Sequence, residues 1–172
     1  EGEVARAFET PELDVHRIAA VSARAGLLRP FPGGTYAVTD RMGAELALAR
    51  DGEHASNLGP LLARRFSARF GVPSFVLDPV TTDEFDPASR LSGVPGVERK
   101  SRNHTLHIKA VARRASQQLG KDLADTRLVV AHMGGGVSVC ALRHGRIVDS
   151  TDALLGEGPF SGERAGTLPL AG

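Results

Sequence analysis

Short apolar runs, bounded by glycine, proline or charged residues, recur along the chain and predict β-strands. The segments with this pattern are residues 18–21, 35–39, 73–79, 128–132, 137–142 and 146–149. A triple glycine, Gly134 to Gly136, joins the run at 128–132 to the next one. The tight connection Arg143-His144-Gly145 joins the run at 137–142 to the run at 146–149. Strands joined by such short glycine-containing turns are typical of antiparallel hairpins.

Apolar residues spaced three or four positions apart predict helices over residues 40–50, 57–70 and 98–119. Asp40 and Asn57 are the expected N-caps of the first two helices, and Gly71 and Gly120 the expected ends of the last two. Residues 1–8 have the pattern of the end of a further helix. The expected buried stripes are Leu58, Leu61, Leu62, Phe66 and Phe70 on the second helix, and Ile108, Val111, Ala112, Ala115 and Leu119 on the third.

The order of these elements changes near residue 120. Strands and helices alternate before it, which is the rhythm of an α/β fold with a mostly parallel sheet. After it, the hairpins form a meander-like, antiparallel pattern. We therefore expect residues 1–120 to form part of one α/β domain and residues 121–172 to begin a second one.

Composition narrows the class of protein. Of 172 residues, 41% are hydrophobic and 24% charged, as in ordinary soluble domains, and the net charge is only +1. We therefore expect neither nucleic acid nor a membrane as the main partner, although the basic helix at 98–119 leaves nucleic acid as an alternative. No run approaches the roughly 20 apolar residues of a membrane span. Cys140 is the only cysteine, which predicts a cytoplasmic protein with a buried, inert thiol.

Several residues are placed where chemistry can occur. Arg24 and Asp78 each follow a predicted strand at its carboxyl end, where α/β sheets bind ligands. Each also has a simpler interpretation, a solvated arginine and a turn-forming aspartate. His104, on the buried face at the start of the third helix, fits a core or capping histidine as well as a catalyst. The triple glycine could bind phosphate through bare backbone N–H groups, or form an ordinary turn.

Two longer stretches carry a resemblance. The run Ala131-His132-Met133-Gly134-Gly135-Gly136-Val137-Ser138 resembles the second phosphate-binding hairpin of the acetokinase family. The segment 152–169, with Gly156-Glu157-Gly158-Pro159-Phe160 and Glu163-Arg164-Ala165-Gly166-Thr167-Leu168-Pro169, resembles the butyrate kinase branch of that family. Residues 33–36, 52–59, 72–80 and 98–101 also match.

The resemblance implies the ribonuclease H-like fold of actin, sugar kinases and heat-shock ATPases. The chain would be a central fragment, truncated at both ends, with most of the first α/β domain and the opening β-hairpins of the second. The implied reaction transfers the γ-phosphoryl group of ATP, with Mg2+, to a short-chain and possibly branched carboxylate such as butyrate or isobutyrate. The implied assembly is a homodimer or larger homo-oligomer. A truncated, non-catalytic module with an assembly or regulatory role is the alternative, and nucleotide titration discriminates between the two.

The resemblance also implies roles for individual residues. Arg24 and Arg164 would bind the carboxylate or the transferring phosphoryl group, His104 would stabilise the transition state, and Asp78 would orient an arginine or act as a base. The nucleotide phosphates would lie on His132, Gly134, Gly135, Gly136 and Ser138, and His54 and Asn57 match the substrate side more loosely. Asn103, where the family usually has an aromatic, and Ala165, in place of a serine, depart from the pattern. Metal ligands are expected outside the segment.

Overall fold

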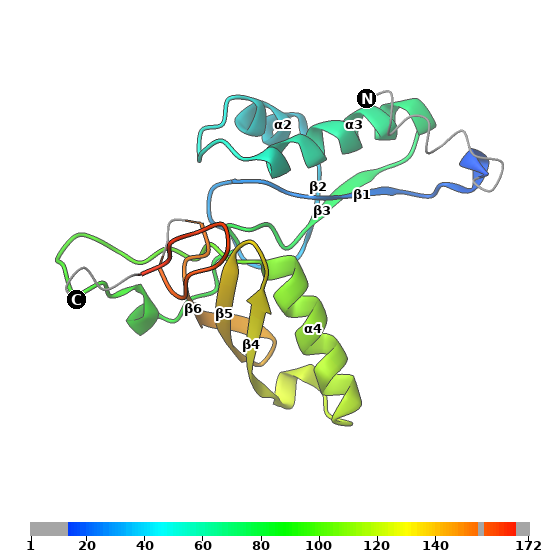
Figure 1. Cartoon of the computed structure of the whole chain (residues 1–172). Helices are drawn as coiled ribbons and strands as arrows, with labels where there is room; N and C mark the ends of the chain where they lie inside the picture. The colour runs from blue at the N-terminus through cyan, green and yellow to red at the C-terminus, as the bar shows by residue number, and fades with distance from the viewer. Residues whose placement is uncertain (1–13, 155–156, 168–172) are drawn as a thin grey trace.

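The structure is a computed structural model that describes residues 14–154 and 157–167 (Figure 1). The described residues form two three-stranded sheets. In the first, β3 (Ser74–Leu77) lies between β1 (Val21–Arg24) and β2 (Thr35–Ala37). β1 runs parallel to β3 and β2 antiparallel to it. The expected parallel pairing is therefore confirmed for two strands, with an antiparallel strand added at one edge. Short 3-10 turns lie at Val15–Arg17, Ala55–Asn57, Pro87–Arg90 and Leu123–Asp125.

Two helices lie together on one side of this sheet, α2 (Asp40–Ala47) and α3 (Leu58–Phe70) (Figure 1). α3 ends as predicted at Gly71, whose φ of 66° closes the helix in the left-handed conformation. The N-cap of α2 is Thr39 rather than Asp40, because the Thr39 hydroxyl accepts the N–H of Met42 at 3.2 Å.

The buried face of α3 differs from the predicted leucine stripe. Its buried residues are Pro60 and Ala63, whereas Leu58 is 59% exposed. Gly59 explains the difference, since a Cβ there would lie 2.2 Å from the carbonyl oxygen of Arg24. The first turn of α3 lies against the end of β1 with no room for a larger side chain, so small residues face the sheet.

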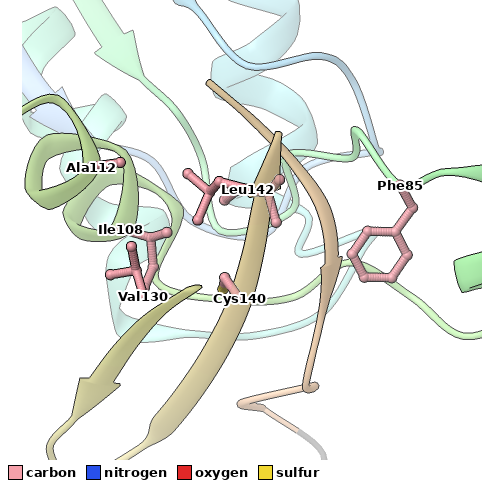
Figure 2. Close-up of a cluster of buried hydrophobic side chains, with 7 residues drawn as sticks. Phe85, Ile108, Ala112, Val130, Cys140 and Leu142 are labelled. Atoms are coloured by element: carbon pink, nitrogen blue, oxygen red, sulfur yellow. The ribbon is translucent and has the colours of Figure 1, made fainter. Parts of the chain in front are cut away.

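The second sheet has the order β4-β5-β6, formed by β4 (Arg127–Met133), β5 (Val137–Arg143) and β6 (Arg146–Ser150). Both pairings are antiparallel, so the predicted hairpins are confirmed. α4 (Thr105–Gln118) lies beside β4 and β5 (Figure 1). Their common core contains Phe85, Ile108, Ala112, Val130, Cys140, Leu142 and Ile147 (Figure 2).

This packing bears on three predictions made from the sequence. Cys140 is fully buried, so the expectation of a buried thiol is confirmed, and burial raises the pKa of the thiol to about 12, which disfavours the reactive thiolate. α4 buries its apolar residues against the second sheet, and the boundary expected near residue 120 stays a prediction. Val111 and Leu119, predicted as buried, are exposed. The buried face of α4 includes the polar residues Thr105, Lys109 and Ser116 instead.

The prediction that this helix begins near Glu98 is wrong. The backbone before Thr105 forms hydrogen bonds to other segments, with Asn103 N donating to the carbonyl of Val80 at 3.2 Å. The carbonyl of Arg102 accepts the N–H of Ala153 at 2.9 Å. Because these groups are used between segments, helical hydrogen bonding starts only after His104. The first strand likewise begins at Val21 rather than Ile18, and the helix predicted over residues 1–8 lies outside the described residues.

Within residues 14–154 and 157–167, no helix combines the length and the apolar character that crossing a membrane requires.

Candidate functional site

The candidate site lies where the first sheet meets α4 and the glycine turn between β4 and β5. Arg24 is the last residue of β1, and Asp78 directly follows β3. Because these strands are parallel, both residues are at the same edge of the sheet, as predicted. His104 directly precedes the first residue of α4. Three elements distant in sequence thus bring their functional side chains to one region.

Two adjoining cavities occupy this region, and Arg24, Val80 and His104 line both. The larger, which we call the histidine cavity, has a volume of about 350 Å³. Its other lining residues are Asp78, Thr105, Leu106, His107, Ala110 and His132. The smaller, the glycine cavity, has a volume of about 170 Å³. Its other lining residues are His54, Arg102, Asn103, Gly135, Gly136, Ala153, Leu154, Glu163 and Arg164.

The two predicted arginines bring more positive charge to the glycine cavity than the carboxylate of Glu163, which also lines it, can balance. Within the part of the chain that the structure describes, neither Arg24 nor Arg164 forms an ion pair with a carboxylate. Arg102, which also lines this cavity, is already paired with the buried carboxylate of Asp152 at 2.5 Å. A guanidinium group without a carboxylate partner can bind the oxygens of a carboxylate or phosphoryl ligand in bidentate fashion.

His104 lies between the two cavities with an electrically neutral ring. Burial, followed by the charges of His132, Arg24 and Arg164, lowers its pKa to about 4. The ring stacks on that of His132, with centroids 3.8 Å apart and planes inclined by 15°. Its Nδ1 lies 2.8 Å from the hydroxyl of Ser138. Near neutral pH, therefore, His104 interacts with a ligand as a hydrogen-bonding group rather than as a cation.

His132 contacts the rings of both His104 and His107, and His107 belongs to α4. Its Nδ1 lies 2.5 Å from Nδ1 of His107, with one ring edge-on to the other. In this hydrogen bond one ring nitrogen donates and the other accepts. Burial, then the charges of His107 and Arg24, lowers the pKa of His132. All three rings line the histidine cavity.

The glycine turn is in tight contact with the loop that carries Arg164. A Cβ on Gly136 would lie 1.7 Å from Nη1 of Arg164 and 3.2 Å from Cε1 of His104. A Cβ on Gly135 would lie 2.5 Å from the carboxylate of Glu163. Glycine at these positions therefore lets the ends of the Arg164 and Glu163 side chains lie directly against the turn.

Ser161 holds that loop in place. Its hydroxyl donates to the carbonyl of Gly135 at 2.7 Å and accepts the backbone N–H groups of Glu163 and Arg164. This local turn sets the position of Arg164 next to the glycine turn. Sequence reasoning missed Ser161, although a serine three residues before a functional arginine has the spacing of a serine–backbone turn.

Asp78 is held by the protein itself. It is buried, its φ of 37° lies in the left-handed region, and its Oδ1 accepts the N–H of Gly34 at 2.9 Å. Lys109 lies 3.8 Å from it and forms a closer ion pair, at 2.7 Å, with the buried Glu84. A backbone angle that is costly for a non-glycine residue is typical of functional positions, and the role expected for Asp78 stays a prediction.

The substrate-side residues separate into two groups. His54 lines the glycine cavity, and its Nδ1 accepts the N–H of Ser56 at 3.1 Å, which leaves Nε2 for a ligand. Asn57 lines neither cavity. Its amide oxygen accepts the N–H of Leu27 at 2.9 Å, and its amide nitrogen donates to the carbonyl of Gly52 at 3.0 Å. Gly134 and Ser138 also lie outside both linings.

Of the two departures from the family pattern, Asn103 is the one in the site. Its amide is buried and bonds to the side chains of Ser101, Ser150 and Thr105. Asn103 therefore fixes the chain immediately before His104. Ala165 is exposed in the loop beside Arg164.

Among the described residues, no group of three or more His, Cys, Asp or Glu side chains could hold a metal ion.

Comparisons with known proteins show which proteins this chain resembles. The model of the acetokinase family matches residues 94–171. Probable butyrate kinases from two strains of Clostridium botulinum are each 50% identical over 157 residues, which is 91% of this chain and 44% of each relative. One from Listeria innocua is 49% identical over the same shares. The chain thus spans less than half the length of the curated relatives it matches.

Solved structures show the same fold. Porphyromonas gingivalis acetate kinase superposes with a TM-score of 0.76 at 21% identity, over 98% of this chain and 46% of that one. A propionate kinase from Francisella tularensis gives 0.73 at 19% identity, with the same coverage. The expected resemblance to the acetokinase family and the expected partial fold are both confirmed.

Proposed function

We propose that this chain is the central part of an acetokinase-family enzyme of the butyrate kinase type. The reaction would transfer the γ-phosphoryl group of ATP to a short-chain carboxylate and give an acyl phosphate and ADP, reversibly. The chain would contribute the centre of the phosphoryl-transfer site, and residues 1–120 and 121–172 would belong to two domains that face each other across it.

One observation carries the proposal: Arg24, Arg164 and His104 line a single small cavity whose floor is the glycine turn. The two guanidinium groups form no ion pair with a carboxylate among the described residues, and Arg102 is paired with Asp152. Against them stands one carboxylate in the lining, that of Glu163, so the cavity keeps a net positive charge and favours an anion. Its volume of about 170 Å³ suits a phosphoryl group or a small carboxylate. Cationic groups with fixed positions are what stabilises charge on a transferring phosphoryl group.

The proposed reaction needs no proton donor or acceptor from the protein. A carboxylate oxygen attacks the γ-phosphorus, a new oxygen–phosphorus bond forms, and the bond from phosphorus to the β-bridging oxygen breaks. The electron pair leaves with ADP, and no proton is transferred. Because the carboxylate is already ionised, no general base is required. Arg24 and Arg164 would bring the two anions together, and His104, as a neutral ring, would donate a hydrogen bond to the phosphoryl oxygens.

The nucleotide would lie over the turn of Gly134, Gly135 and Gly136, next to His132. Bare backbone at such a turn lets phosphates approach N–H groups closely. Mg2+ bound to the phosphates would neutralise part of their charge and keep them in line. Asp78 is held by Gly34 and Lys109, so its role would be to orient this edge of the sheet.

Kinetics of the full-length protein that contains this chain would test the proposal. We expect ATP-dependent turnover with butyrate or isobutyrate, and acetate is assayed beside them as a third carboxylate. Arg24→Ala and Arg164→Ala should each lower kcat/KM by about a hundredfold or more, since each removes a charge-assisted contact worth roughly 1.5–3 kcal/mol and loosens the alignment of the anions.

Arg41→Ala is the matched control, because Arg41 is a surface arginine paired only with Glu45 at 2.9 Å. It should leave turnover unchanged. Absence of turnover with all three carboxylates, or equal effects of the three arginine substitutions, would contradict the proposal.

A further inference from the structure

Ser138 is fully buried on β5, and the only polar groups that reach its side chain within the described residues belong to His104. The backbone N–H of His104 lies 3.2 Å from the Ser138 hydroxyl oxygen, and Nδ1 of the His104 ring lies 2.8 Å from it. The hydroxyl therefore touches His104 at two points, across the junction between β5 and the start of α4.

The proton of this hydroxyl can be placed by elimination. A serine hydroxyl has one proton and two acceptor positions. The backbone N–H of His104 can only donate, so it occupies one acceptor position. The hydroxyl proton then has a single neighbour that can accept it, Nδ1 of the same histidine. If Nδ1 carried a proton instead, the hydroxyl proton would be buried without an acceptor, which folded proteins avoid.

We propose that Ser138 is a positioning residue that holds the imidazole of His104 in the tautomer with its proton on Nε2. The serine fixes both the ring orientation and the identity of the protonated nitrogen. This inference reassigns Ser138, expected from the sequence to contact the nucleotide, to a position behind the histidine. It rests on the proposed function in one respect only, the hydrogen bond that the Nε2 proton would donate to a phosphoryl oxygen.

The other neighbours of the ring support this assignment. His132 stacks on one face at 3.8 Å, so it limits ring rotation and offers no in-plane hydrogen bond. Arg24 and Arg164 line the glycine cavity with His104, and His107 contacts the far side of His132. These neighbours are basic, and the acidic groups that line the cavities with His104 are Asp78 and Glu163. Burial, together with the basic neighbours, outweighs them, disfavours an imidazolium and keeps the ring neutral. A neutral ring has one N–H, and Ser138 leaves it on Nε2.

The consequence is a defined hydrogen-bond donor beside two guanidinium groups. Within the described residues, Nε2 of His104 has no hydrogen-bond partner, while Nδ1 is used by Ser138. With the opposite tautomer, Nε2 would present a lone pair to an incoming anion and repel it. Ser138 thereby determines whether His104 attracts or repels a phosphoryl group.

Nitrogen-15 NMR of the histidine side chains measures the tautomer directly. The full-length protein that contains this chain is labelled at its histidines, and His104 is identified by the resonance lost in His104→Gln. We expect an unprotonated Nδ1 and a protonated Nε2 at pH 7. A protonated Nδ1 in the unsubstituted chain would overturn the inference, whatever the variants do.

Substitutions at Ser138 test the positioning. Ser138→Ala should broaden or shift the His104 ring signals towards the mixture of tautomers found in free imidazole, and Ser138→Thr, which keeps a hydroxyl, should restore the signature. Ser116→Ala is the matched control, because it removes another buried hydroxyl that bonds only within α4, to the carbonyl of Ala112 at 2.9 Å. Identical His104 spectra for Ser138→Ala and the unsubstituted chain would contradict the inference.

Inorganic phosphate serves as the anion probe. We expect it to shift the Nε2 resonance of His104, with an apparent affinity that falls about tenfold in Ser138→Ala and is unchanged in Ser116→Ala. The tautomer of His104, measured without phosphate, tests the inference about Ser138 by itself. An Nε2 tautomer without any phosphate binding would count against the proposed function alone.

Discussion

Gly136→Ala is the substitution that most sharply separates a functional contact from a structural one. The added Cβ would lie 1.7 Å from Nη1 of Arg164, where ordinary contacts begin near 3.4 Å, so the guanidinium must move by about 1.7 Å. The backbone itself tolerates alanine, since the φ of Gly136 is outside the left-handed region. The displaced atoms are the end of a flexible side chain, so folding should lose no more than about 0.5 kcal/mol.

The effect on catalysis should be large by comparison. A shift of about 1 Å in a group that aligns reactants can cost a hundredfold in rate, and a lost charge-assisted hydrogen bond costs about 1.5–3 kcal/mol. We therefore expect kcat/KM of the full-length protein to fall by one to two orders of magnitude, while its melting temperature changes by no more than a few degrees.

Gly162→Ala is the matched control from the same loop, because a Cβ there would meet no atom within 4 Å and its φ is not in the left-handed region. Steady-state kinetics and thermal unfolding of both variants form the assay. If Gly136→Ala keeps full activity, or if it loses activity only by unfolding, the assignment of Arg164 to the reacting anion is wrong.

Three further predictions concern stability. Because the folded pKa of His104, about 4, lies below the ordinary 6.5, the unfolded chain binds the extra proton first as pH falls. The unfolding free energy should decrease from pH 6.5 to 4, by about 1–2 kcal/mol after allowance for solvent, and urea titrations should show a smaller decrease in His104→Gln. Lys109→Met removes the cation beside the buried carboxylates of Glu84 and Asp78 and should lower the unfolding free energy by about 3–5 kcal/mol. The double variant with Glu84→Gln should recover much of this loss, and no recovery would refute an electrostatic cause. Ile108→Ala should cost about 2–5 kcal/mol by urea denaturation and Val111→Ala under 1, since only the first is buried, and equal costs would contradict the packing.

The hairpins were predictable because their signals are local. The alternation of residues 137–142 and the glycines between the strands specify an antiparallel turn without reference to the rest of the chain. Arg24 and Asp78 were predictable for a related reason, since strand ends follow from the apolar runs and parallel strands end at one edge of a sheet. These residues define most of the region in which the cavities lie.

The errors arose where tertiary contacts override a local pattern. Residues 98–104 have charged and polar residues compatible with a helix, but their backbone groups bond to Val80 and Ala153 instead. The leucines of α3 have helical spacing, and yet the close approach of Gly59 to Arg24 turns Pro60 and Ala63 towards the sheet. Neither contact is visible in a window of neighbouring residues.

Side-chain partnerships within the site were the least accessible to sequence reasoning. Asn57 looks like a substrate ligand in its motif, but both ends of its amide are bonded to backbone groups of Leu27 and Gly52. Ser138 lies within the glycine-turn motif, but its hydroxyl faces His104, which is 34 residues earlier in the chain. Such pairings depend on how β5 docks against the start of α4, which only the folded chain specifies.

Phosphorus-31 NMR of the full-length protein with MgATP and butyrate tests the central claim most directly, because it distinguishes transfer to a carboxylate from transfer to water. The account predicts an acyl phosphate resonance that grows in step with ADP and is lost in Arg164→Ala. Release of inorganic phosphate as the primary product, or ATP that remains intact in the presence of short-chain carboxylates, would contradict it.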